Sequence, residues 1–204
     1  MNMQFSSRST RASFRVLAAV LMLSASGLIF ELTLTPIFSA SIWYHYTFVP
    51  ISWALFGCGL GGFLVYLLQM GRWGKAVQPM LVVLCLLLAI ALPLFPWGIL
   101  KYPFVPELLN FYFVMGLLPF IAGGAALSLA FEAYGSDSNR LYFADLVGAA
   151  LGTLMVPLLV SCFGAETAIL ATAVLPALAG ILLSMGPAFA NRREWTVVAV
   201  LALI

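Results

Sequence analysis

Apolar runs of about twenty residues recur along the chain, and they constrain its fold more than any other feature. Such a run, coiled as a helix, crosses the roughly 30 Å of hydrocarbon in a bilayer. Lipid offers the backbone no hydrogen-bond partner, so the segments are expected to be helical. Only 8% of the 204 residues are charged, whereas a soluble domain carries about 25%. We therefore expect an all-α, polytopic transmembrane helix bundle.

The runs predict six complete spans and the start of a seventh. Residues 1–15 are expected to form a cytoplasmic N-terminal segment, and residues 16–204 the transmembrane helical domain. The six spans are expected near residues 16–38, 50–70, 77–98, 109–134, 140–162 and 167–189, and the incomplete seventh at 195–204. That last run supplies about 14 Å of helix, half a bilayer, so we expect the natural chain to continue.

Basic residues alternate between the connecting segments. Eight of the nine fall on one side of the predicted bundle: Arg8, Arg11, Arg15, Arg72, Lys75, Arg140, Arg192 and Arg193. Lys101 alone falls on the other side. Because cytoplasmic loops carry the excess of Lys and Arg, the amino terminus is predicted to be cytoplasmic.

Several kinds of site find no support in the composition. Cys58, Cys85 and Cys162 are far apart and His45 is the only histidine, so no metal site is expected. The net charge of +2 indicates no nucleic-acid surface. A GxGxxG pattern in the second span lies in an apolar helix with no preceding strand, so it predicts no dinucleotide cofactor. No catalytic site and no cofactor are expected within these residues.

Glu31 is the acid that the membrane accommodates least easily. It lies about 22 Å into the first span, beyond the bilayer midplane. A carboxylate at a helix centre costs about 2.5–3.5 kcal/mol on insertion scales. We expect it to face the bundle, with nearby hydroxyl groups as hydrogen-bond partners. It is either a ligand or proton site or an interhelical hydrogen bond. The nearby hydroxyl residues are Ser24, Ser26, Thr33 and Thr35.

Asp145 is expected to lie nearer the cytoplasmic face, about 9 Å into the fifth span. Its depth differs from that of Glu31 by roughly 10 Å, so the two carboxyl groups are not expected to pair directly. Gly148 follows Asp145 by three residues, and both should share one helix face. Asp145 is expected either to form an interhelical hydrogen bond or to belong to a ligand site, and the sequence leaves both roles possible.

Two glycine pairs have the four-residue spacing that allows helices to approach closely. Gly57 and Gly61 form such a pair in the second span, and Gly148 and Gly152 form one in the fifth. Both pairs predict helix packing.

Three segments together resemble the membrane region of bacterial spermidine synthase-like multi-pass proteins: "SGLIFEL", "GCGLGGFLVYLLQMGRWGK" and "RLYFADLVGAALG". The most specific match is a Tyr-x-x-Asp-x-x-Gly-x-x-x-Gly pattern, which begins at Tyr142. The resemblance implies a membrane bundle in the bacterial inner membrane. It also implies a cytoplasmic aminopropyltransferase-like domain, whose catalytic residues have no counterpart before Ile204.

Three functions are compatible with these observations. The chain is an integral membrane domain that anchors or serves a transferase domain and binds an amine or hydrophobic ligand near Glu31, Asp145 and Tyr142. Alternatively, it is an accessory subunit of a larger membrane complex, or a small-molecule transporter. The expected partners are the lipid bilayer and other transmembrane helices or membrane subunits, including a second copy in a homo-oligomer; nucleic acid is not expected.

Overall fold

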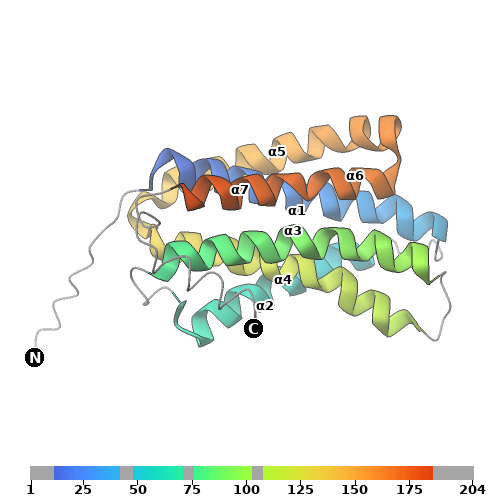
Figure 1. Ribbon diagram of the computed structural model, residues 1–204, viewed down its shortest axis with the longest axis horizontal. Coiled ribbons are helices and arrows are strands. Elements are labelled where there is room, and N and C mark those ends of the chain that lie inside the picture. Colours follow the sequence, from blue (N-terminus) through green and yellow to red (C-terminus); the bar gives the residue numbers. More distant parts are fainter. Residues whose placement is uncertain (1–11, 42–47, 71–75, 103–107, 186–204) are drawn as a thin grey trace, which may run out of the picture.

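The computed structural model describes residues 12–41, 48–70, 76–102 and 108–185, in which every regular element is a helix. The helices lie side by side along the long axis of the molecule (Figure 1). They are α1 (Phe14–Ser41), α2 (Val49–Leu67), α3 (Val77–Lys101), α4 (Leu109–Ala133), the short 3-10 turn η4 (Gly135–Asp137), α5 (Ser138–Phe163), α6 (Ala165–Thr172) and α7 (Val174–Ser184).

Six helical segments of the described residues are long and apolar enough to cross a membrane, as expected for a multi-pass membrane protein. Four of them lie on the single helices α1 to α4. The fifth, Gly135–Phe163, combines η4 and α5, and the sixth, Ala165–Ser184, combines α6 and α7. The predicted seventh span at 195–204 lies outside the described residues.

The sixth predicted span, near 167–189, begins within α6, and its residues 186–189 lie outside the described residues. The helix is interrupted at Ala173, between α6 and α7, and α7 ends at Ser184. Pro176 explains the interruption, because a proline has no N–H to donate and its ring crowds the carbonyl four residues earlier. That carbonyl belongs to Thr172, the last residue of α6.

The second span is shorter than predicted. It ends at Leu67 rather than at residue 70. Gln69, two residues later, has a φ of 51°, a left-handed backbone conformation that an α-helix cannot continue through.

One residue, Gly164, connects α5 to α6. Its φ of 81° and ψ of 162° lie in a backbone region that is essentially restricted to glycine. The chain therefore reverses direction between two spans without a loop.

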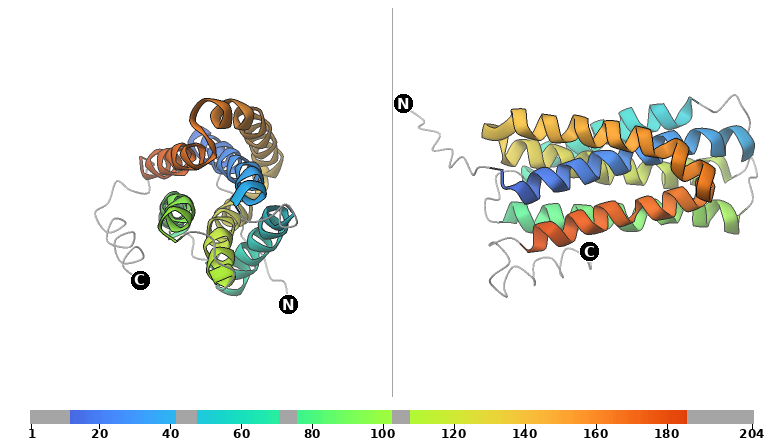
Figure 2. Two further views of the ribbon diagram at one scale, coloured as in Figure 1. Left: turned by 90° about the vertical axis from the view of Figure 1, so that its right-hand side faces the viewer. Right: turned by 90° about the horizontal axis from the view of Figure 1, so that it is seen from above.

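α1 lies at the centre of the bundle, where it packs against α4, α5, α6 and α7 (Figure 2). α2 packs mainly on α4, and α3 packs on α4 and α7. Aromatic rings fill the space between α1 and its neighbours: Phe38 lies 5.2 Å from Trp53, and Phe30 lies 5.2 Å from Phe120, between ring centroids. Many large apolar side chains stay exposed on the outside of the bundle, as lipid contact requires.

Candidate functional site

A cavity of about 160 Å³ lies inside the bundle, against α1. Five helices line it: α1 between Leu23 and Glu31, α2 with Ala54 and Cys58, α3 with Leu88 and Leu92, α4 between Pro119 and Leu127, and α5 with Asp145 and Ala149. An engineered apolar cavity of about 150 Å³ accommodates benzene, so this one has room for a small organic group.

The cavity lies halfway along its helices. Residues 23–31 occupy the middle of α1, a helix of 28 residues, and residues 88–92 occupy the middle of the 25-residue α3. In a bundle that spans the bilayer, this position is near the midplane, where polar groups cost the most.

Asp145 lies at one end of the cavity and has a partner. The hydroxyl of Ser24 on α1 donates a hydrogen bond to Asp145 Oδ1. The same hydroxyl lies 3.0 Å from the Val20 carbonyl oxygen, one helical turn earlier. Ser24 carries one proton, so these two acceptors share it. This bond joins α5 to α1 through polar groups inside the apolar bundle.

Glu31 lies at the other end of the cavity, and the structure gives its carboxyl group no hydrogen bond or ion pair with any described residue. Ser24, expected near Glu31 as a partner, bonds Asp145 instead. Ser26 donates to the Leu23 carbonyl oxygen at 2.7 Å, and the buried Thr33 hydroxyl has no partner among the described residues. Glu31 is half-buried in apolar surroundings.

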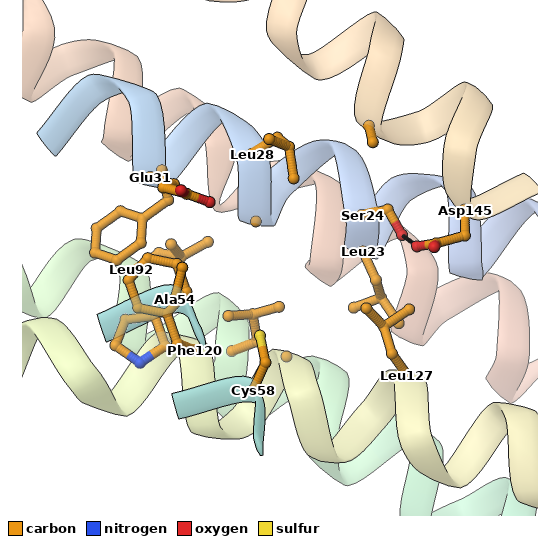
Figure 3. A pocket seen from close by; sticks show the side chains of 16 residues that line it. Leu23, Ser24, Leu28, Glu31, Ala54, Cys58, Leu92, Phe120, Leu127 and Asp145 are labelled. Atoms are coloured by element: carbon orange, nitrogen blue, oxygen red, sulfur yellow. Dashed lines mark hydrogen bonds between the residues drawn. The ribbon is translucent and has the colours of Figure 1, made fainter. Parts of the chain in front are cut away.

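The two carboxyl groups therefore share one cavity without contacting each other. Figure 3 shows Glu31 at one end and the Ser24–Asp145 pair at the other, with apolar side chains between them. Seven residues of α1 separate Glu31 from Ser24, which corresponds to about 10 Å of helix rise. The sequence places the acids at different depths, but it does not reveal that one cavity connects those depths.

Two glycines hold α5 against α1 beside Asp145. A Cβ atom added to Gly148 would lie 2.2 Å from the Leu21 carbonyl oxygen, and one added to Gly152 would lie 2.6 Å from that of Ala25. Any side chain there would force the helices apart. The close backbone contact brings Asp145 within reach of Ser24.

A second glycine contact holds α2 against α4 on the opposite wall of the cavity. A Cβ atom on Gly61 would lie 2.4 Å from the Ile121 carbonyl oxygen, and one on Gly124 would lie 2.4 Å from Cys58 Cα. A Cβ atom on Gly57 would lie 2.5 Å from Phe120 Cβ. These contacts place Cys58 and Phe120 in the cavity wall.

The cavity reaches the surface of the bundle between α2 and α5. Cys58 of α2 lines the cavity and is exposed, and Ala149 of α5 is half-buried. These two helices lie on the same side of the molecule (Figure 2) and form no substantial contact within the described residues. In a membrane, such a mouth opens toward lipid.

None of the described residues that line the cavity is basic, so neither acid has a cationic partner among them. Within the described part of the chain, no group of three or more His, Cys, Asp and Glu side chains gathers that could hold a metal ion. The arrangement offers two carboxyl groups in a mainly apolar cavity, and a carboxylate there can pair with a cationic group.

Tyr142, expected to belong to the same site, does not line the cavity. Its side chain is 57% exposed on the outside of α5. The sequence also gives little indication of the wall formed by Phe120, Leu88 and Leu92. The signal that could have found this wall is Pro119 and Gly123 in α4, because proline and glycine make a transmembrane helix irregular where it lines a cavity.

No known protein family, curated protein or solved structure matches this chain. The resemblance to spermidine synthase-like membrane regions rests on the sequence motifs alone.

Proposed function

We propose that this protein is an integral membrane domain whose central cavity binds an organic amine. The observation that carries this proposal is the pair of carboxyl groups, Glu31 and Asp145, in one apolar cavity that no basic side chain of the described residues lines. Asp145 already accepts a hydrogen bond from Ser24, whereas Glu31 has no partner among the described residues. Glu31 is therefore the group that receives the ammonium.

The chemistry of the cavity selects for a cation with an apolar body. A carboxylate in apolar surroundings is costly when unpaired, and a bound ammonium supplies both the opposite charge and the hydrogen-bond donors. The rest of the ligand contacts Leu28, Leu92 and Phe120, which favour aliphatic or aromatic carbon.

The mouth between α2 and α5 gives the route of entry. A ligand dissolved in the bilayer reaches the cavity from the side, past Cys58, without crossing a polar gate. This route favours amines that partition into membranes.

Photolabelling in nanodiscs tests the proposal. A photoreactive alkylamine should label residues 23–31 and 119–127 of the wild type, and Glu31→Gln should lower this labelling about tenfold or more, as expected for loss of a desolvated charge pair. Glu132→Gln is the matched control, because Glu132 is an exposed acid at the end of α4 and does not line the cavity. An alcohol of equal length should label weakly.

Two outcomes would refute amine binding at this site. In the first, Glu31→Gln and Glu132→Gln label as strongly as the wild type. In the second, the alcohol labels the cavity as well as the amine, which would show that only apolar contact is recognised.

We further propose that the bundle belongs to a spermidine synthase-like protein of the bacterial inner membrane, with its amino terminus in the cytoplasm. The motif from Tyr142 to Gly152 supports the family, and the eight basic residues on one side of the predicted bundle support the orientation. A cytoplasmic transferase domain would then follow an even number of spans, so at least one span beyond the predicted seventh would precede it. The coding sequence beyond Ile204 tests the domain, and reporter fusions after Lys75 and Lys101 test the orientation. A cytoplasmic signal after Lys101 would contradict it.

The outward face of α5 favours a second function, that of a subunit in a larger membrane complex. Most of α5 is exposed, including Phe143, Leu154 and Leu158, and another transmembrane helix or a second copy of the chain fits such a surface as well as lipid does. Purification in a mild detergent distinguishes the two, because a monomer without a co-purifying protein contradicts the subunit role.

A further inference from the structure

A second, larger depression of about 510 Å³ lies between α1 and α5, away from the central cavity. Apolar side chains from both helices form most of it, including Leu21, Met22, Phe143 and Val147. Its polar members, Asn139 and Arg140, both belong to the first turn of α5. We call this depression the α1–α5 groove.

The polarity of the groove changes along its length. α1 and α5 begin at the same end of the molecule, where the Ala12 N–H donates to Asp137 Oδ2 at 2.7 Å (Figure 1). Asn139 and Arg140 therefore lie at the membrane boundary, and Met22 and Val147 lie about 12 Å deeper by helix rise. A polar entrance above an apolar interior matches the two parts of a phospholipid.

Arg140 supplies an unbalanced positive charge at this entrance. The guanidinium group is exposed, and no carboxyl group of the described residues forms an ion pair with it. None of the described residues that line the groove is acidic. Arg15 does not add to this charge, because its guanidinium donates to the Met185 carbonyl oxygen on the α7 side.

We propose that the α1–α5 groove binds an anionic phospholipid. The phosphate accepts hydrogen bonds from the Arg140 guanidinium and the Asn139 amide, and an acyl chain lies along Phe143, Leu21 and Val147. Arginine binds phosphate through two parallel N–H bonds, which makes it a good headgroup ligand. An anionic lipid is preferred because a zwitterionic headgroup brings its own cation to compete with Arg140. The site does not depend on the amine cavity.

Native mass spectrometry of the delipidated full chain tests this site. Phosphatidylglycerol should bind more tightly than phosphatidylcholine with the same acyl chains, and Arg140→Gln should reduce that preference about fivefold, as expected for one basic residue at a membrane surface. Lys101→Gln is the matched control, since it removes one positive charge at the other end of the bundle. It should leave the preference unchanged.

A second measurement keeps the test valid if Arg140→Gln lowers the yield of protein. Phosphatidylglycerol with a photoreactive acyl chain should label residues 14–22 and 139–147 of the wild type, and Ala18→Phe, which fills the groove, should remove that label. The proposal is overturned if the two lipids bind equally, if Lys101→Gln acts like Arg140→Gln, or if soluble glycerol phosphate displaces the lipid at equal concentration.

Discussion

The two ends of the central cavity each hold a carboxyl group, but only one of the two groups has a hydrogen-bond partner among the described residues. At one end, Asp145 accepts a hydrogen bond from Ser24, and close backbone contacts at Gly148 hold its helix in place. At the other end, Glu31 faces the cavity without a partner among the described residues. The difference indicates that Asp145 serves mainly to join α5 to α1, whereas Glu31 remains available to a ligand.

The largest expected effect concerns the contact that supports the Asp145 end. Gly148→Leu should lower the free energy of unfolding by about 3 kcal/mol or more, because its side chain must displace the backbone of α1. Unfolding with sodium dodecyl sulfate in mixed micelles measures this change. Gly59→Leu is the control, since a Cβ at Gly59 meets nothing within 4 Å. Equal effects of both substitutions would show that α5 does not depend on this contact.

The stability of the protein should respond differently when each of the two acids is replaced by leucine. Glu31→Leu should stabilise the protein by about 2.5 kcal/mol, because it removes a carboxyl group without a partner from the apolar interior. The same variant should lose amine labelling, so stability rises as binding falls. Asp145→Leu should give no gain, since it removes a partnered group. If both variants gain equally in the same unfolding assay, the comparison between the two ends fails.

The hydrogen bond between α1 and α5 should contribute less. Ser24→Ala should destabilise the protein by about 1 kcal/mol, because Asp145 loses its donor inside the bundle. Ser184→Ala is the control, since this hydroxyl is exposed and donates only to the Ile181 carbonyl oxygen. A double-mutant cycle with Asp145→Leu isolates the bond, and a coupling energy near zero would contradict its role.

The smallest effect is expected at Tyr142. Tyr142→Phe should change the unfolding free energy by less than about 0.5 kcal/mol, because the side chain is exposed and removed from the cavity. It should also leave amine labelling unchanged. A large loss of labelling would show that Tyr142 belongs to the binding site after all. The cavity would then have to extend around α5 to reach it.

The sequence was sufficient to predict the membrane bundle, because uninterrupted apolar length is a local property that needs no knowledge of packing. Helix ends were less predictable. Pro176 interrupts the sixth span and Gln69 follows the early end of α2, and such effects depend on a few backbone angles.

The candidate site was predictable in its residues but not in its arrangement. Glu31 and Asp145 are conspicuous in the sequence because ionisable residues are rare inside spans. The cavity that the two acids share depends on how five helices pack, and the spacing of the acids in the sequence does not predict that packing. The hydrogen bond of Ser24 was unpredictable for the same reason. Ser24 was expected to bond Glu31 in its own helix, but it bonds Asp145 on α5, a helix far away in the chain.

The one-residue connection at Gly164 has a consequence for the biosynthesis of this protein. Because no loop separates the two helices, α5 cannot enter the bilayer while α6 is still outside it. The hairpin formed by α5 and the segment from α6 to α7 must therefore insert as one unit. Glu166, two residues after the turn, then has to be carried across the membrane with the hairpin if the amino terminus is cytoplasmic. The apolar surface of both helices must offset that transfer in a single event at the translocon.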